Sequence, residues 1–271
     1  MNRLKQKKED AQVFIGERKK GLNLLAVMVV RNVKTMYRES VLGIIWTVLN
    51  PLLTMFVLSF VYSQVFGRNM VDIKYPVYVL SGMIVYNTLF RAGTMQGLTS
   101  IVQKRSLVMQ TRINPTYYPR IAVYTALVNF GFAFIALIIV MLIVKQPFHW
   151  TLFMMLVMLP PLVMMTMGIA FVLSVVYVYF RDINNIYNVF ATLLMYATPI
   201  FYTVDALKNP LFEKFSQFNP MYYFVTYFRE VIKGNVPDLG LHLVLYGLGI
   251  FLYAFGLIFI SRNKKKFIFH L

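Results

Sequence analysis

The sequence contains no cysteine, and none of its ten acidic residues lies within a long apolar run. Without cysteine the chain has neither disulfides nor a thiolate metal site, and its three scattered histidines do not form a histidine metal cluster. Transporters that couple to protons or sodium ions commonly place carboxylates inside the bilayer, and membrane transferases need acidic groups near their substrate. The placement of the acids therefore argues against a secondary transporter, a channel and a membrane enzyme.

The phosphate-binding pattern Gly-x-x-x-x-Gly-Lys-Ser/Thr is absent as well. We therefore expect no catalytic residue, no metal and no cofactor on this chain, and any ATP and Mg that drive it should be bound by a separate ATPase. The sequence also shows no internal repeat, so closing a two-fold symmetric conduit would require a second copy of the chain.

What the sequence does contain is mostly apolar, with 59% hydrophobic and only 14% charged residues. Soluble domains carry about a quarter charged residues, so we interpret the chain as an integral membrane protein. The net charge of +17 would suit nucleic acid, but Lys and Arg lie between the apolar runs rather than along one soluble face. This distribution favours basic loops beside anionic lipid and argues against nucleic acid as a partner.

Six apolar runs predict an all-α integral membrane fold. A helix needs about 20 apolar residues to cross the hydrocarbon core, and the second run is short but rich in tyrosine. The predicted spans, which together form a transmembrane domain over residues 44–260, are residues 44–66, 75–90, 121–144, 152–180, 183–202 and 241–260.

The segments before and between the first spans are basic or polar. Residues 1–43 combine a basic arm with an amphipathic segment, Leu22–Met36, which predicts a helix lying on the cytoplasmic leaflet. Residues 91–120 form a polar connection that predicts short helices outside the bilayer.

Residues 203–240 contain no full span but many Tyr and Phe residues. Asn219-Pro220 has the form of a helix cap followed by proline at the first helical position, and we predict two short amphipathic helices over 211–218 and 220–233. Residues 261–271 form a basic tail. With both termini in the cytoplasm, 20 of the 27 Lys and Arg residues lie on the cytoplasmic side, which places the segment 203–240 outside.

Four separated segments resemble the polysaccharide-export permeases, which are the membrane subunits of ATP-binding-cassette exporters for O-antigen, capsule and teichoic acid. The first is YRESVLGIIWTVLNP at Tyr37–Pro51. The others are Arg181-Asp182-Ile183, Pro199 near the end of the fifth predicted span, and Asn219-Pro220 with Arg229 nine residues further on. The segments follow one another in order across nearly the whole chain.

This resemblance implies a multi-pass permease in the cytoplasmic membrane that forms a homodimer and binds two copies of an ATPase subunit. It further implies export of a polyprenyl-diphosphate-linked glycan, such as teichoic acid, O-antigen or a similar polysaccharide. A sister permease that exports a drug, haem or a small lipid shares the same fold and the same dependence on an ATPase, and it stays open as the alternative.

The resemblance suggests two candidate segments for coupling to the ATPase, one in the connection after the second span and one at Arg181-Asp182. For the second segment the alternative is a local cap, because the helix dipole favours a carboxylate at the start of the fifth span. The predicted coupling residues are Gln103, Lys104, Arg105, Arg112, Arg181 and Asp182.

The remaining predictions concern the route of the substrate. Tyr37, Arg38 and Trp46 lie where the chain enters the membrane and are predicted to meet the lipid diphosphate headgroup, although plain interfacial anchoring explains them equally well. Aromatic faces pack on sugar rings, so Tyr62, Tyr78, Tyr86 and Tyr196 are predicted to line the channel, with ordinary packing inside the protein as the alternative. The predicted outer gate contains Phe215, Phe218, Tyr222 and Tyr223.

Overall fold

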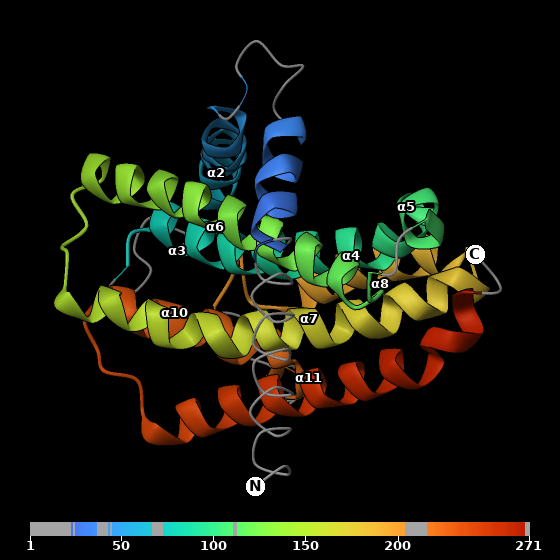
Figure 1. Ribbon diagram of the computed structural model, residues 1–271. Helices are drawn as coiled ribbons and strands as arrows, with labels where there is room; N and C mark the ends of the chain where they lie inside the picture. Colours follow the sequence, from blue (N-terminus) through green and yellow to red (C-terminus); the bar gives the residue numbers. More distant parts are fainter. Residues whose placement is uncertain are drawn as a thin grey trace, which may run out of the picture. The chain divides into compact units, whose positions relative to one another are not determined.

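The chain forms two compact units, Met1–Gly43 and Ile44–Leu271, in a computed structural model that describes residues 23, 25–36, 43, 45–66, 73–110, 113–203 and 216–268 (Figure 1). In the first unit, residues 25–36 are helical and coincide with the predicted amphipathic segment. The location of this helix on the cytoplasmic leaflet stays a prediction.

The regular secondary structure in the described part of the second unit consists of helices, which agrees with the predicted fold class. Three of its helical segments are long and apolar enough to cross a membrane, namely Tyr117–Ile143, Trp150–Tyr179 and Leu239–Lys264. The count of six spans stays a prediction. The helices in chain order are α2 (Ile45–Phe66), α3 (Tyr75–Met83), the π-helix η1 (Ile84–Arg91), α4 (Ala92–Gln103), α5 (Arg105–Gln110), α6 (Tyr117–Ile143), the 3₁₀-helix η2 (Trp150–Met154), α7 (Met155–Tyr179), α8 (Ile183–Ala197), α10 (Pro220–Lys233) and α11 (Leu239–Ile268).

The helical conformation that begins at Tyr75 does not end at Phe90, where the predicted span ends. It continues through η1 and α4 to Gln103 without a break. Gly93 and Gly97, which belong to the polar connection predicted to form short helices, lie inside α4 and allow it to pack against α6 and α7. A Cβ atom on Gly93 would lie 2.7 Å from Thr166 Cγ2, and one on Gly97 would lie 2.5 Å from Ala170 Cβ. These glycines therefore serve close helix packing rather than a turn.

The fifth predicted span is shorter in the structure than in the sequence pattern. Helix α8 ends at Ala197, and Thr198 already has an extended backbone. The cause is Pro199, because the residue before a proline is disfavoured in the helical conformation. The described residues after α8, Thr198–Thr203, are not helical.

Helices α7 and α11 pack against each other through a seam of glycines. A Cβ atom on Gly256 would lie 2.1 Å from the carbonyl oxygen of Gly168, and one on Gly249 would lie 2.7 Å from that of Pro161. A Cβ atom on Gly168 would meet the backbone of Leu252 at 2.2 Å. The two backbones thus approach as closely as in membrane helix pairs that carry small residues at their interface.

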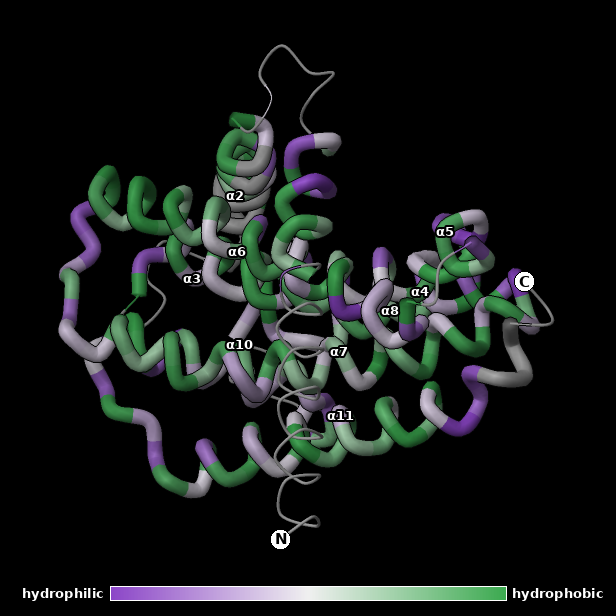
Figure 2. The backbone as a smooth tube through the Cα atoms, in the orientation of Figure 1, coloured by the Kyte–Doolittle hydropathy of each residue, from purple (hydrophilic) through white to green (hydrophobic). Residues whose placement is uncertain are grey.

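The hydrophobic core of the second unit lies between α3, η1, α6, α7 and α10. Its largest fully buried side chains include Tyr86, Phe130, Phe224, Tyr227 and Phe228. Figure 2 shows apolar residues along the long helices and hydrophilic residues gathered at the helix ends and in the connections. This pattern matches helices that cross an apolar layer between two aqueous phases.

Candidate functional site

Two of the four segments that carry the family resemblance, Pro199 and Asn219-Pro220 with Arg229, meet in space at the non-helical stretch after α8. The Asn219 side chain caps α10 by accepting a hydrogen bond from the Met221 backbone N–H at 2.9 Å, and its Nδ2 donates to Thr198 Oγ1 at 2.7 Å. The start of α10 is therefore fixed to the end of α8. The cap confirms the prediction from Asn219-Pro220, whereas the bond to Thr198 does not follow from the sequence, because the two residues lie 21 positions apart.

Arg229 of α10 contacts the same non-helical stretch from inside the protein. Its side chain is 7% exposed. Nη1 donates to the carbonyl of Pro199 at 2.7 Å, and Nη2 donates to those of Ile200 at 3.0 Å and Tyr78 at 3.2 Å. The guanidinium also lies 3.4 Å from the centre of the Tyr78 ring. A buried cation is thus held by backbone dipoles and an aromatic face, and no carboxylate of the described residues is bonded to it.

Two tyrosines of α3 hold the same stretch from the other side. Tyr75 donates its hydroxyl hydrogen to the carbonyl of Phe201 at 3.0 Å, and Tyr78 donates to that of Tyr202 at 2.8 Å. We call this set the clasp: Tyr75, Tyr78, Asn219 and Arg229 around the backbone of residues 198–202. The hydrogen bonds of the clasp join α3 and α10 to the stretch after α8, and the bond from Arg229 to the Tyr78 carbonyl joins α10 to α3, so the clasp fixes these three elements to one another.

The other end of α10 is also fixed. Gly234 follows the helix in the left-handed conformation, with φ of 95°, and a Cβ atom there would lie 2.8 Å from the ring of His149. Glu230 accepts hydrogen bonds from Lys233 Nζ at 2.8 Å and from Asn235 Nδ2 at 2.7 Å. Burial alone would raise the pKa of Glu230, but these bonds and the Lys233 charge outweigh it and lower the pKa.

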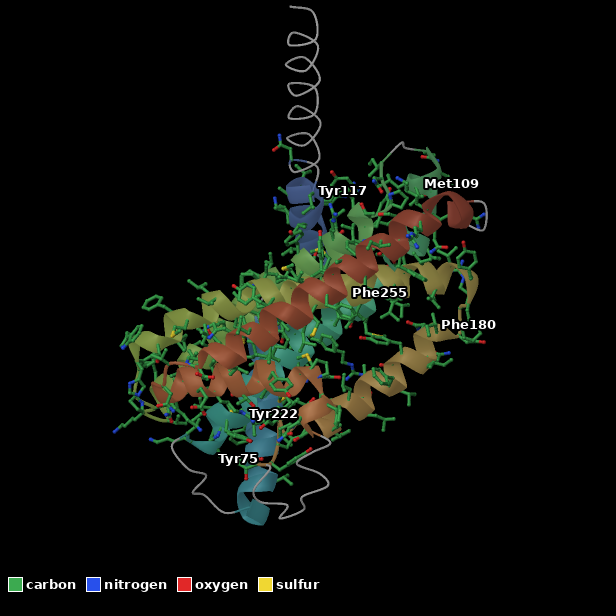
Figure 3. All side chains as sticks on the ribbon, turned by 90° about the horizontal axis from the view of Figure 1, so that it is seen from below. Tyr75, Met109, Tyr117, Phe180, Tyr222 and Phe255 are labelled. Carbon is green, nitrogen blue, oxygen red and sulfur yellow. The ribbon has the colours of Figure 1, made fainter. Side chains whose placement is uncertain are left out.

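Of the predicted gate residues, Phe218 is 87% exposed, and Tyr222 and Tyr223 lie edge to face with ring centres 5.4 Å apart. Tyr223 donates its hydroxyl hydrogen to the carbonyl of Gln217 at 2.8 Å. Figure 3 shows Tyr222 close to Tyr75 of the clasp and far from Met109 and Phe180. Phe215 lies outside the described residues.

The predicted coupling residues lie at the opposite end of the second unit, where Figure 3 draws Met109 of α5 and Phe180 after α7. Gln103 and Arg105 flank the junction of α4 and α5 and are exposed, and Lys104 between them is half-buried. Arg112 lies outside the described residues. The structure therefore brings both predicted coupling segments to the same end of the unit.

Arg181 and Asp182 connect α7 to α8, and both are exposed. The Arg181 guanidinium lies 4.9 Å from the centre of the Tyr177 ring. Asp182 is the residue that precedes α8, but its side chain makes no capping hydrogen bond. The favourable interaction of the Asp182 carboxylate with the helix dipole is therefore what still supports the local-cap alternative.

The predicted channel residues fall into two groups. Tyr78 and Tyr86 are buried in the core, and their hydroxyls bond to backbone carbonyls, that of Tyr86 to Ala191 at 2.5 Å. In this structure both follow the packing alternative. Tyr196 of α8 is 56% exposed, which leaves its side chain accessible.

The residues predicted at the start of the membrane domain are mostly outside the described part of the chain. This applies to Tyr37, Arg38 and the side chain of Tyr62. Trp46, in the first turn of α2, is 44% exposed, as expected of a side chain that faces lipid or a headgroup.

Sequence reasoning missed a second polar cluster, which lies between η1 and α8. Arg91, the last residue of the π-helix, donates from Nη2 to Asn188 Oδ1 at 2.9 Å and to Thr192 Oγ1 at 3.1 Å. The available signal was an arginine directly after an apolar run together with two polar residues four positions apart on α8. In the sequence Arg91 simply marks the predicted end of a span.

These features define a multi-pass helical membrane protein whose polar side chains tie helices together. The chain belongs to the ABC-2 type transporter family, whose sequence profile matches residues 23–232. It is similar to two proteins named O-antigen export system permease protein RfbA. The one from Myxococcus xanthus is 26% identical over 89% of this chain and 93% of its own length, and one from Klebsiella pneumoniae is 25% identical over 90% and 93%.

A third relative is the polysialic acid transport protein KpsM of Escherichia coli. It is 22% identical over 77% of this chain and 81% of its own length. The family membership confirms the resemblance drawn from the four sequence segments. The chain is therefore a membrane subunit of an ABC transporter.

Proposed function

We propose that this chain is the permease subunit of an ABC exporter that moves a polyprenyl-diphosphate-linked cell-surface polysaccharide, such as teichoic acid or O-antigen, across the cytoplasmic membrane. The observation that carries the proposal is the similarity to O-antigen export permeases over about nine-tenths of both chains. A polymer needs a wide route, and one chain without an internal repeat encloses such a route most simply as a homodimer.

Two copies of a separate ATPase subunit supply the energy in this proposal. The exposed residues at the junction of α4 and α5, together with Arg181 and Asp182, offer a contact surface at one end of the second unit. Their common location supports one docking site built from two separate segments. The ATPase subunit, not this chain, binds ATP and Mg.

The opposite end of the unit serves as the outer gate. Helix α10 is amphipathic and carries Tyr222 and Tyr223, and the clasp connects it to α3. The gate opens when ATP brings the two halves of the transporter together.

A disulfide between Cys residues placed at Phe218 in both protomers should stop export and leave ATP binding intact, and the natural chain has no cysteine that interferes. Unchanged export by the cross-linked protein would contradict the gate.

The central test is ATP hydrolysis by the chain co-purified with its ATPase subunit in lipid nanodiscs, with and without lipid-linked glycans. We expect one glycan class to change the rate of hydrolysis. A stable complex that is indifferent to every glycan but responds to a drug, haem or a small lipid would favour the alternative substrate class. Failure to form a complex with the ATPase would contradict both.

A further inference from the structure

We propose that Arg91, Asn188 and Thr192 form a binding site for the diphosphate group of a lipid-linked substrate within the membrane domain. This inference rests on the proposed function, which supplies such a substrate. The three residues come from two helices far apart in the sequence, and they meet where η1 passes α8.

The local backbone explains why Arg91 reaches this position. Residues 84–91 form a π-helix inside an otherwise α-helical segment, a rare conformation that occurs frequently at functional sites. Directly after it, Gly93 and Gly97 let α4 pack against α6 and α7. Arg91 is only half-buried at the edge of this packing, beside α8.

Arg91 is not needed to attach α8, because two buried hydroxyl groups already do so. Tyr86 donates to the carbonyl of Ala191 at 2.5 Å, and Tyr187 donates to Thr94 Oγ1 at 2.8 Å. Both tyrosines are at most 6% exposed. A further cation at the exposed edge of the same contact adds little to the attachment, and intramembrane charges are costly to keep without a function.

The partners of Arg91 orient its guanidinium without neutralising it. Asn188 Oδ1 and Thr192 Oγ1 are neutral acceptors, and both bonds use the same nitrogen, Nη2. Within the described ranges no carboxylate pairs with Arg91, and its Nη1 and Nε atoms donate to no described residue. An oriented guanidinium with unused donors and a full positive charge is suited to phosphate, which it binds through parallel charge-assisted hydrogen bonds.

The position along the helices fits a headgroup rather than a soluble anion. Helix α8 starts at Ile183, next to the predicted cytoplasmic contact with the ATPase. At 1.5 Å per residue, Asn188 and Thr192 lie roughly 8 to 14 Å along the helix from that end. With the start of α8 at the cytoplasmic membrane surface, as in the predicted orientation, this depth is within the hydrocarbon layer, where a diphosphate that leaves the inner leaflet first loses its water.

The test measures binding of undecaprenyl diphosphate, without a glycan, to the permease–ATPase complex in nanodiscs of neutral lipid. Undecaprenol and inorganic pyrophosphate are the comparison ligands. We expect Arg91→Gln and Asn188→Asp each to weaken binding of the lipid diphosphate about tenfold or more. Lys145→Gln, which removes an exposed charge from the turn between α6 and η2, should change it less than twofold.

Asn188→Asp separates binding from attachment of the helix. A carboxylate at this position still accepts the hydrogen bond from Arg91, so the melting temperature should not fall, but its charge neutralises the guanidinium. Unchanged lipid diphosphate binding in both variants would overturn the site. Equally tight, Arg91-dependent binding of inorganic pyrophosphate would overturn the lipid headgroup as the ligand.

The proposed function can fail separately from this site. Stimulation of the wild-type ATPase by lipid-linked glycans tests the export function and does not involve the variants. A wild-type complex that binds undecaprenyl diphosphate through Arg91 but ignores every glycan would retain the site and refute glycan export. Stimulation of the ATPase by a glycan, combined with unaltered binding of undecaprenyl diphosphate in both variants, would support glycan export and refute the site.

Discussion

At the residue scale, Arg229 is the charged side chain of the clasp. It donates to the carbonyls of Pro199 and Ile200, which the break after α8 leaves without helical partners, and to the carbonyl of Tyr78 in α3. A buried acceptor that loses its donor costs about 1–3 kcal/mol. The arginine therefore stabilises a local conformation that the backbone of residues 198–202 does not stabilise by itself.

Arg229→Met should consequently lower the free energy of unfolding by about 2 kcal/mol or more, because it leaves the carbonyls of Pro199 and Ile200 buried and unsatisfied. The measurement is the thermal midpoint of the purified permease in detergent. Arg181→Met is the matched control, since Arg181 is exposed and only contacts the face of Tyr177, a contact worth about 0.5–1 kcal/mol. Equal midpoints for the two variants would show that the clasp contributes no stability.

The carboxylate of Glu230 makes the stability of the folded protein depend on pH. Its pKa in the folded protein lies below the ordinary value of 4.5, so it stabilises the folded state above about pH 4.5, and this contribution is lost as the pH falls through the folded pKa. We expect Glu230→Gln to be less stable than wild type at pH 7 and the difference to shrink as the pH falls below 4.5 and through the folded pKa. A difference that persists unchanged at acid pH would assign the effect to packing.

At the element scale, the seam between α7 and α11 shows how the sequence specifies a helix contact. Gly168, Gly249 and Gly256 lie where an added Cβ atom would meet the backbone of the opposite helix, whereas Gly247 of α11 has open space around its Cα. The same residue type thus has opposite roles on two faces of one helix. Only the structure distinguishes them.

Gly256→Ala should destabilise the protein by about 1–3 kcal/mol, as expected when a close-packed backbone must move apart. Gly247→Ala should be neutral or slightly stabilising, because alanine favours a helix over glycine. Thermal midpoints of the two variants and of the wild type check this directly. A loss of stability in Gly247→Ala equal to that in Gly256→Ala would contradict the packing argument.

Most helices could be predicted from the sequence because apolar runs of the required length are visible without any tertiary information. The helix boundaries near Arg91 and Thr198 could not be predicted from the sequence. The sequence predicted separate short helices after residue 90, and the packing of Gly93 and Gly97 against Thr166 and Ala170, which shows that α4 continues the preceding helix, is visible only in the structure. Helix α8 stops early because of a single proline, and the run of apolar residues beyond it hides the break.

At the scale of the whole molecule, the two groups of predicted functional residues lie at different ends of the second unit. The candidate coupling residues gather at one end, and the clasp with Tyr222 lies away from them (Figure 3). The sequence predicted these two groups of residues but not the contacts within them. Tyr78 and Tyr86, for example, are aromatic residues in apolar helices, and only the position of α8 shows that their hydroxyls are already bonded inside the protomer.

The predicted orientation can be tested with single cysteines in this cysteine-free chain. Cys at Arg105 and at Arg181 should react with a membrane-impermeant maleimide only in inverted vesicles, and the bound ATPase should slow both reactions. Cys at Lys145, an exposed residue at the other end, should react in intact cells with a permeabilised outer envelope. Labelling of all three positions from the same side would contradict the topology.

The unbroken helical segment from Tyr75 to Gln103 connects three parts of the molecule. Tyr78 bonds to α10 near one end, Arg91 faces α8 in the middle, and Gln103 adjoins the candidate ATPase contact at the other end. A twist applied at any of these points would be transmitted to the others along the continuous helical backbone. The π-helix in its middle, with wider and less regular turns than an α-helix, is the place where such torque would first change the winding.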